Sequence, residues 1–182
     1  MAPLRPRPLE ASAFAPYGDV IEAGGAVCRY EINEGSTVRF HDLARIDPGA
    51  GGRAIVSIFR CRAGDESPVR IRTMERHPLG SQAFVPLGGG SWLVVVAPPG
   101  DTVAPGAIEA FVARGDQGVN LAPGVWHHPL IPCGDERDFL VIDRDGEGAN
   151  CDVIELATER LLAAVDSVPA DAAGAGRMPA GD

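Results

Sequence analysis

The chain has 182 residues, a length that favours a single domain able to enclose a hydrophobic core. Its formal net charge of -9 argues against a general nucleic-acid binder, because phosphate contacts need a basic face. All 16 basic residues are arginines, and this absence of lysine excludes Schiff-base chemistry, a pyridoxal-phosphate cofactor and a lysine-dependent nucleotide phosphate loop.

Targeting features and cysteines indicate the compartment. No apolar run approaches the roughly 20 residues that a membrane span needs, and the first residues lack the apolar segment of a secretory signal. The cysteines are scattered without a C-x-x-C pair, which predicts reduced thiols and neither a zinc site nor a disulfide framework. They are Cys28, Cys61, Cys133 and Cys151. We therefore expect a soluble cytoplasmic protein that binds neither membranes nor nucleic acids.

The first third of the chain combines an arm, a short helix and strands. Residues 1–9 are rich in proline and arginine and predict a loosely held arm. Residues 10–15 predict a helical turn that ends before Pro16. The sequence Asn33-Glu34-Gly35-Ser36 indicates the turn of a hairpin. Strands are predicted at 27–32, 37–43 and 54–61.

The rest of the chain alternates short apolar segments with turns that contain glycine or proline. Further strands are predicted at 69–75, 82–85, 92–97, 108–114, 117–121, 137–144 and 151–156. Residues 158–165 have helical composition, and the Ala/Gly/Pro-rich tail at 166–182 predicts disorder. About ten short strands predict a mainly β fold, an antiparallel barrel or jelly roll with a few short helices, in one domain at 1–165.

Polar residues gather at a strand–turn–strand segment, residues 74–87. Glu75 and His77 are two apart on the incoming strand, so their side chains share a face. A proline and a glycine favour a turn, and Gln82 begins the outgoing strand. A carboxylate, an imidazole and an amide can thus converge, as in a metal shell of oxygen and nitrogen ligands or in an acid–base cluster. The alternative is an exposed rim that carries a few polar residues.

This segment resembles the first motif of the cupin superfamily, which reads His-x-His, a short gap and Glu. Here Glu75 stands in place of the first His and Gln82 in place of Glu. The second cupin motif, a Pro-Gly turn closely followed by His, matches Pro123-Gly124-Val125-Trp126-His127. The resemblance implies that both motifs meet in a barrel lumen and form a divalent-metal shell, with a metal-free cluster as the alternative because Gln is a weaker ligand than a carboxylate. The candidate ligands are Glu75, His77, Gln82 and His127.

Other polar residues are candidates for the lumen. His127 and His128 are adjacent on a strand and point to opposite faces, so we expect His128 to be a packed or interface histidine. An arginine at a strand position could enter the barrel and clamp a substrate carboxylate. The candidate substrate-binding residues are Gln82, Arg60, His41 and Arg72.

Longer blocks resemble one family of that superfamily, from about residue 9 to residue 156. They include Glu75-Arg76-His77-Pro78-Leu79-Gly80, Gln117-Gly118-Val119-Asn120, Trp126-His127-His128-Pro129-Leu130 and Asn150-Cys151-Asp152-Val153. These blocks are similar to those of the ureidoglycolate lyase family. The resemblance implies a cupin-type barrel, usually a homodimer, that converts (S)-ureidoglycolate to glyoxylate and urea in purine breakdown through allantoin. It also implies a divalent metal, nickel among those used.

Ureidoglycolate carries a hydroxyl, a carboxylate and a urea nitrogen on one carbon. Its cleavage needs a base that takes the hydroxyl proton and an acid that protonates the departing nitrogen. We expect His127 or Glu75 to be the base and His77 to help donate the proton, directly or as a metal ligand. Three alternatives stay open: a ureidoglycolate amidohydrolase that releases ammonia and carbon dioxide, a cupin metal dioxygenase, and a non-catalytic barrel that senses a small acid.

Overall fold

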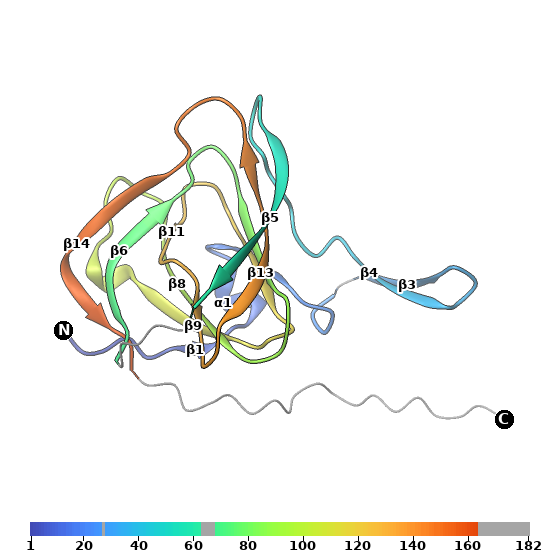
Figure 1. The fold of residues 1–182 in the computed structure, drawn as a ribbon, viewed down its shortest axis with the longest axis horizontal. Coiled ribbons are helices and arrows are strands. Elements are labelled where there is room, and N and C mark those ends of the chain that lie inside the picture. The colour runs from blue at the N-terminus through green and yellow to red at the C-terminus, as the bar shows by residue number, and fades with distance from the viewer. Residues whose placement is uncertain (27, 63–67, 164–182) are drawn as a thin grey trace.

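The computed structural model describes residues 1–26, 28–62 and 68–163, in which two large β-sheets enclose a common core (Figure 1). The seven-stranded sheet contains, in spatial order, β1 (Arg7–Pro8), β9 (Glu109–Ala113), β8 (Trp92–Ala97), β11 (Trp126–His127), β6 (Arg70–Arg76) and β14 (Asp152–Leu161), with β12 (Ile131–Pro132) also paired to β8. The five-stranded sheet contains β2 (Gly18–Ile21), β10 (Gly118–Leu121), β7 (Gln82–Pro86), β13 (Arg137–Asp145) and β5 (Arg53–Cys61). Apart from β1, which runs parallel to β9, the strands of these sheets pair antiparallel.

Two short helices complete the described body, α1 (Ala11–Phe14) and η1 (Pro105–Ala107). No helix among the described residues is long and apolar enough to cross a membrane. The predicted mainly β, antiparallel fold with a few short helices is therefore confirmed.

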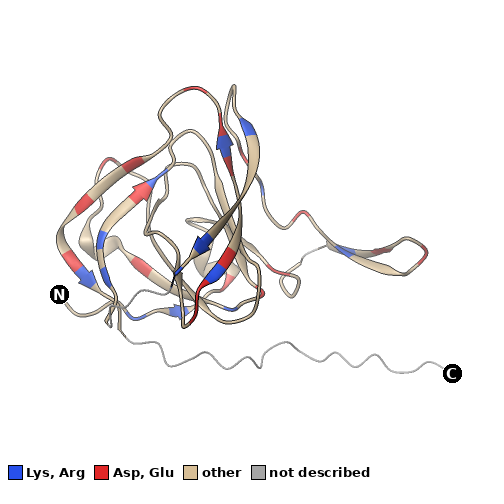
Figure 2. Ribbon diagram, viewed as in Figure 1, with Lys and Arg blue, Asp and Glu red and all other residues tan. Residues whose placement is uncertain are grey.

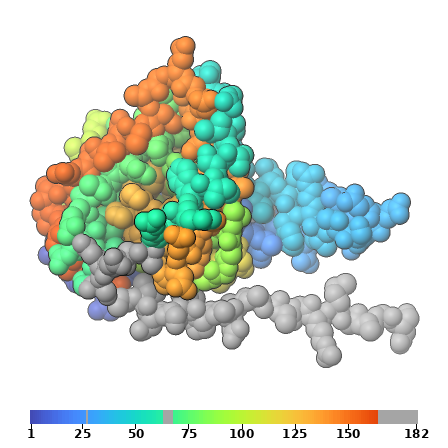
Figure 3. Space-filling view, in the orientation of Figure 1, coloured from blue at the N-terminus to red at the C-terminus, as the bar shows by residue number. Residues whose placement is uncertain are grey.

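A separate hairpin of β3 (Cys28–Ile32) and β4 (Thr37–His41) projects from this body, as Figures 1 and 3 show. Its turn has the predicted conformation, since Asn33 and Glu34 adopt φ angles of 53° and 57°. Nearly all side chains of the two strands are exposed. The hairpin therefore contributes little to the core that positions the candidate site.

The core explains why the sequence of β8 is almost continuously apolar. Val94 and Val96 pack in the core between the two large sheets, whereas Leu93 and Val95 pack in a second core on the other face of the strand. Each fully buried valine or leucine side chain stabilises the fold by about 1.5–3 kcal/mol. The central strands are thus well packed and hold the neighbouring polar side chains in position.

Both ends of the described chain differ from the prediction. Residues 1–9 are not a loose arm, because Leu4 and Leu9 are buried and β1 extends the sheet beside β9. Residues 158–161 are not helical but belong to β14, whose pairing with β6 outweighs local helix propensity. Residues 164–165 and the tail at 166–182 lie outside the described residues. Tail disorder and the single domain at 1–165 stay predictions.

Arginines and acidic residues are distributed along many strands of both large sheets (Figure 2). Ion pairs mark the two ends of the β5–β13 pairing, where Arg60 meets Asp138 and Arg53 meets Asp145. Exposed pairs of this kind contribute about 0–1 kcal/mol each. They hold the edge strand in register without dominating its stability.

Candidate functional site

Three of the side chains predicted to converge lie together beside the pairing of β6 with β11. His127 stands opposite Glu75 in the register of these neighbouring strands. His127 Nε2 is 3.3 Å from Glu75 Oε1, and the ring centroids of His77 and His127 are 5.3 Å apart. One ligand atom from each of the three side chains lies within 4.8 Å of the others. We call Glu75, His77 and His127 the acid–imidazole cluster.

Two turns hold the cluster together. His77 follows β6 directly, and the Pro123-Gly124 turn precedes β11. Gly124 adopts a φ of 79°, a left-handed conformation that glycine reaches without strain. Its N–H donates a 2.9 Å hydrogen bond to the backbone carbonyl of His77. A backbone hydrogen bond therefore joins the two sequence motifs directly.

The ring of His77 has a defined orientation. Its Nδ1 lies 2.5 Å from the backbone carbonyl oxygen of Asn150. A carbonyl only accepts, so Nδ1 carries the proton, and in the neutral ring Nε2 keeps a free lone pair. Nε2 is buried and has no hydrogen-bond partner among the described residues. His77 thus presents a nitrogen that can accept a proton or bind a metal.

His127 is almost completely buried and has two alternatives for its proton. With the proton on Nε2, the ring N–H faces Glu75 Oε1 at 3.3 Å, a poorly aligned contact. With the proton on Nδ1, the ring faces the Val125 carbonyl at 3.3 Å, and Nε2 places a lone pair beside the carboxylate. The second arrangement brings two ligand atoms side by side, which a shared cation or a shared proton relieves.

Glu75 remains the anionic member of the cluster. Its hydrogen bond with His127 lowers the pKa of the carboxyl below the ordinary value, against the opposing effect of burial. The neighbouring imidazoles act in the same direction as the hydrogen bond. Glu75 is therefore ionised at neutral pH and available to a cation or to a proton from substrate.

Gln82 borders the cluster from the facing sheet. It lies on the same face of β7 as Phe84, whose ring centroid is 6.1 Å from that of His127. Gln82 is buried, and its Oε1 has no hydrogen-bond partner among the described residues. The approach of Gln82 to Glu75 and the two imidazoles stays a prediction.

Asp143 is a further acidic residue of this region that the sequence analysis did not select. It shares a face of β13 with the buried residues Phe139 and Val141 and forms a hydrogen bond with Gln82. Burial raises the pKa of Asp143, and the Gln82 hydrogen bond and His77 partly offset that effect. In the sequence, Asp143 follows Phe139 and Val141 at the same spacing of two. This spacing could have identified Asp143 as an inward-facing residue.

The donor atoms of this region suit a divalent cation. The acid–imidazole cluster offers one carboxylate oxygen and two imidazole nitrogens, and Gln82 offers an amide oxygen. Mixed oxygen and nitrogen sets of this kind bind first-row divalent metals. The orphaned Nε2 of His77, with Nδ1 anchored on a carbonyl, is the arrangement usual for a metal-binding histidine. The residues therefore fit the predicted metal shell.

The structure does not bring three of the predicted substrate-binding residues to the acid–imidazole cluster. Arg60 is on the outer face of β5, where it forms a bidentate pair with Asp138 at 2.8 and 2.9 Å. Arg72 is three residues from Glu75 and therefore on the other face of β6, exposed beside Glu159. His41 is exposed at the end of β4 in the projecting hairpin.

His128 occupies the position expected for a packed histidine. It follows His127 and lies half-buried, with Nδ1 2.8 Å from the carbonyl oxygen of Pro129. Burial lowers the pKa of His128 below its ordinary value. Its ring is therefore neutral at physiological pH.

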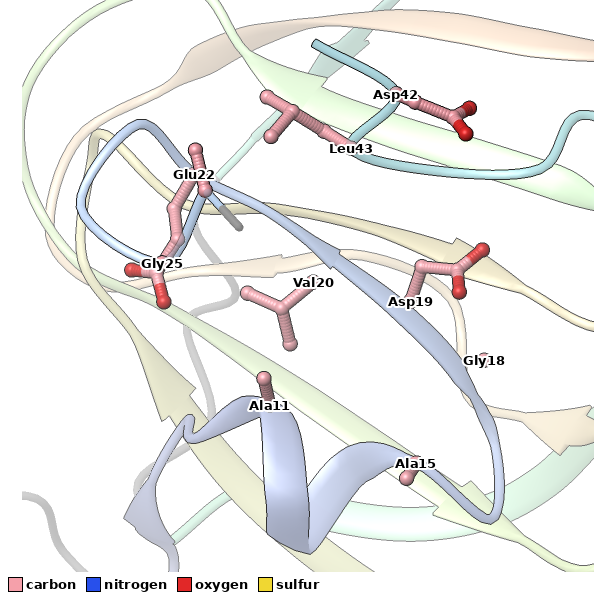
Figure 4. Close-up of a pocket in the computed structure, with 10 residues that line it drawn as sticks. Ala11, Ala15, Gly18, Asp19, Val20, Glu22, Gly25, Asp42 and Leu43 are labelled. Carbon is pink, nitrogen blue, oxygen red and sulfur yellow. The ribbon is translucent and has the colours of Figure 1, made fainter. Parts of the chain in front are cut away.

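A separate pocket of about 240 Å³ lies between α1 and β2 (Figure 4). Small residues form one wall, with Ala11 and Ala15 rising from the helix, and the acidic residues Asp19, Glu22 and Asp42 line the rest. Asp19 accepts hydrogen bonds from the Arg45 N–H and Asn120 at 3.0 Å each. Glu22 accepts from Arg114 at 3.0 Å and Gln117 at 2.7 Å. Because Asp19 and Glu22 are satisfied within the fold, we assign no site here.

Known proteins resemble this chain over most of its length. A family model described as ureidoglycolate lyase matches residues 1–163. The chain is 50% identical to a ureidoglycolate lyase of Pseudomonas putida over 163 residues, 89% of this chain and 96% of that protein. It is 55% identical to a ureidoglycolate lyase of Azotobacter vinelandii over 146 residues, 80% of this chain and 87% of that protein. Among solved structures, it is similar to an oxalate decarboxylase of Bacillus subtilis with Mn(II) centres, at a TM-score of 0.39 and 13% identity over 82% of this chain and 30% of that one. This last likeness is too distant to support an argument.

Proposed function

The chain belongs to the ureidoglycolate lyase family, and from this premise we propose that its lyase reaction takes place at the acid–imidazole cluster. The reaction cleaves (S)-ureidoglycolate to glyoxylate and urea. One observation carries the proposal: a carboxylate and two imidazoles meet within 4.8 Å, and Nε2 of His77 is buried without a partner among the described residues. Buried acceptor atoms of this kind call for a proton or a cation.

The chemistry needs only proton transfers around one bond cleavage. The hydroxyl of the carbinol carbon loses its proton, its electrons form the carbonyl of glyoxylate, and the C–N bond breaks. The bonding electrons stay with nitrogen, which takes up a proton as urea leaves. The atoms balance without water, an oxidant or a covalent enzyme intermediate. A positioned base and a positioned acid contribute about 10²–10⁴-fold each.

The cluster supplies both proton-transfer groups. The candidate acceptors for the hydroxyl proton are the anionic Glu75 and, when the ring proton of His127 is on Nδ1, the Nε2 of His127. His77 can exchange a proton only at Nε2, because Asn150 occupies Nδ1. It therefore acts as an acceptor when neutral and protonates the urea nitrogen only from its imidazolium form.

We further propose that a divalent metal, with nickel as the first candidate, is held by the predicted shell. The ligands would be Glu75, His77, Gln82 and His127. When bound, such an ion lowers the pKa of the substrate hydroxyl and offsets developing negative charge. Glu75 then serves as a ligand, and the proton acceptor must be another group at the cluster or water.

The assembly and context of the enzyme are also proposals. The outer face of β5 exposes Val56 by 65% and Ile58 by 53%, an apolar surface that favours a homodimer. Light scattering should show a dimer for the wild type and a monomer after Val56→Arg with Ile58→Arg; a wild-type monomer contradicts the proposal.

The four free cysteines agree with a cytoplasmic location, and the substrate agrees with a role in purine breakdown through allantoin.

One assay tests the function directly. Purified protein is incubated with racemic ureidoglycolate, with and without a chelator, and glyoxylate, urea and ammonia are quantified. We expect equal amounts of glyoxylate and urea from one enantiomer, without ammonia. Release of ammonia and carbon dioxide instead identifies an amidohydrolase, a requirement for oxygen identifies a dioxygenase, and binding without turnover identifies a sensor. Each of these results contradicts the proposal.

A further inference from the structure

Gln82 and Asp143 are cross-strand neighbours between β7 and β13. The adjacent pair, Ala83 with Ile142, is in register, so one further step along the antiparallel pairing brings Gln82 opposite Asp143. Side chains at such positions have Cβ atoms about 4.5–5.5 Å apart. The register therefore brings the Gln82 amide within reach of the Asp143 carboxylate, where an amide donor lowers the pKa of that carboxyl.

The partner of the Gln82 amide determines which end faces the cluster. An ionised carboxylate only accepts hydrogen bonds, so Asp143 engages the Nε2 donor of Gln82 and not its oxygen. The Oε1 atom is then the free end, buried and without a partner among the described residues. Gln82 lies on the face of β7 that also carries Phe84, whose ring centroid is 6.1 Å from that of His127.

The same pair accounts for the charge of the shell. Glu75 is the one carboxylate of the acid–imidazole cluster, and Gln82 adds a neutral oxygen. Asp143 lies across the strand pair and close enough to His77 to interact with it electrostatically. The Asp143 carboxylate thus provides a second negative charge next to the Gln82 amide, outside the cluster itself.

We propose that Asp143 is a positioning residue that turns the Gln82 oxygen into the acid–imidazole cluster and supplies the second negative charge for a bound divalent cation. This inference rests on the proposed metal shell. It assigns no contact between Asp143 and the ion: Asp143 acts through the Gln82 amide and through its charge.

The test measures Mn²⁺ binding to metal-free protein by calorimetry, with free Mn²⁺ followed by electron paramagnetic resonance. We expect Asp143→Asn to weaken binding by about 10- to 100-fold, the usual effect of losing a residue that orients a ligand. The matched control is Asp138→Asn on the same strand, where the carboxylate pairs with Arg60 at the surface. This control should retain wild-type affinity.

A charge exchange separates positioning from general stability. The double variant Gln82→Glu with Asp143→Asn exchanges the two groups, so that the carboxylate stands at position 82 and the amide at position 143. Mn²⁺ affinity should then return to within several-fold of the wild type. Thermal unfolding verifies that each variant is folded. Wild-type affinity in Asp143→Asn, or no recovery in the exchanged variant, overturns the inference alone. Absence of Mn²⁺ binding by the wild type overturns the metal shell as well, whereas lyase activity measured with chelator reports separately on the reaction.

Discussion

The α1–β2 pocket and the acid–imidazole cluster both gather acidic side chains, yet the partners of those side chains differ. In the pocket, Asp19 and Glu22 accept hydrogen bonds from backbone, amide and guanidinium donors. In the cluster, the neighbours of Glu75 are imidazoles, and Nε2 of His77 has no partner among the described residues. Acids with donors stabilise the fold, whereas acceptors grouped without donors are available for a proton or a cation. Proximity of carboxylates alone does not identify a site.

The strongest test of this contrast replaces one histidine in each region. We expect His77→Ala to lower kcat/KM for glyoxylate release by about 100-fold or more, because Nε2 is lost as a ligand or proton-transfer atom. His41→Ala, on the exposed hairpin, should leave it unchanged. Circular dichroism verifies the fold. Near-normal release by folded His77→Ala refutes the assignment of the cluster.

Matched glutamates sharpen the comparison. Glu75→Gln should lower kcat/KM by about 100-fold and change stability little, because the amide still packs beside His127. Glu22→Gln should leave kcat/KM unchanged but reduce the free energy of unfolding by about 1–3 kcal/mol, since Arg114 and Gln117 lose an anionic acceptor. Kinetics and urea unfolding measure both. The contrast fails if the two variants show the same pattern.

Metal binding should distinguish the regions by its effect on stability. At a Ni²⁺ or Mn²⁺ concentration of about 100 times Kd, binding to the native state adds about 2.7 kcal/mol and raises Tm. The increase should persist in Glu22→Gln and disappear in His127→Ala, since only the latter removes a ligand. Scanning calorimetry with and without chelator measures it. An increase that persists in His127→Ala places the ion elsewhere.

The smallest expected effect concerns His128, which follows β11 directly. Burial lowers its pKa below the ordinary 6.5, so the unfolded state binds more protons as the pH falls. The stability that His128 contributes is complete above about pH 6.5 and declines as the pH drops toward the lowered value. The difference in unfolding free energy between wild type and His128→Gln should therefore shrink between about pH 8 and pH 5. A pH-independent difference contradicts this origin.

Sequence spacing predicted the part of the site that is local. Glu75 and His77 share a strand face by their separation of two, and the Pro123-Gly124 turn fixed the place of His127. Alternating apolar segments and turns likewise predicted the hairpin at Asn33 and most strands. These features depend on backbone periodicity and turn chemistry, which a single sequence displays.

The features that sequence analysis missed depend on pairing between distant strands. Arg60 is directed outward because β5 pairs with β13 in a register that sets it beside Asp138. Asp143 becomes relevant only because that same strand also pairs with β7 and brings it to Gln82. The buried N-terminal segment and the end of β14 are likewise fixed by sheet partners. Register between distant segments is a tertiary property.

The acceptor that orients His77 belongs to the main chain. A side-chain substitution at position 150 leaves this carbonyl in place, although it removes the amide oxygen that binds the Leu79 N–H. An insertion or deletion in the connection between β13 and β14 would instead shift the carbonyl away from the imidazole. The orientation of the His77 ring thus depends on the length of the loop between β13 and β14. Substitutions in this loop preserve that orientation, whereas a change in its number of residues does not.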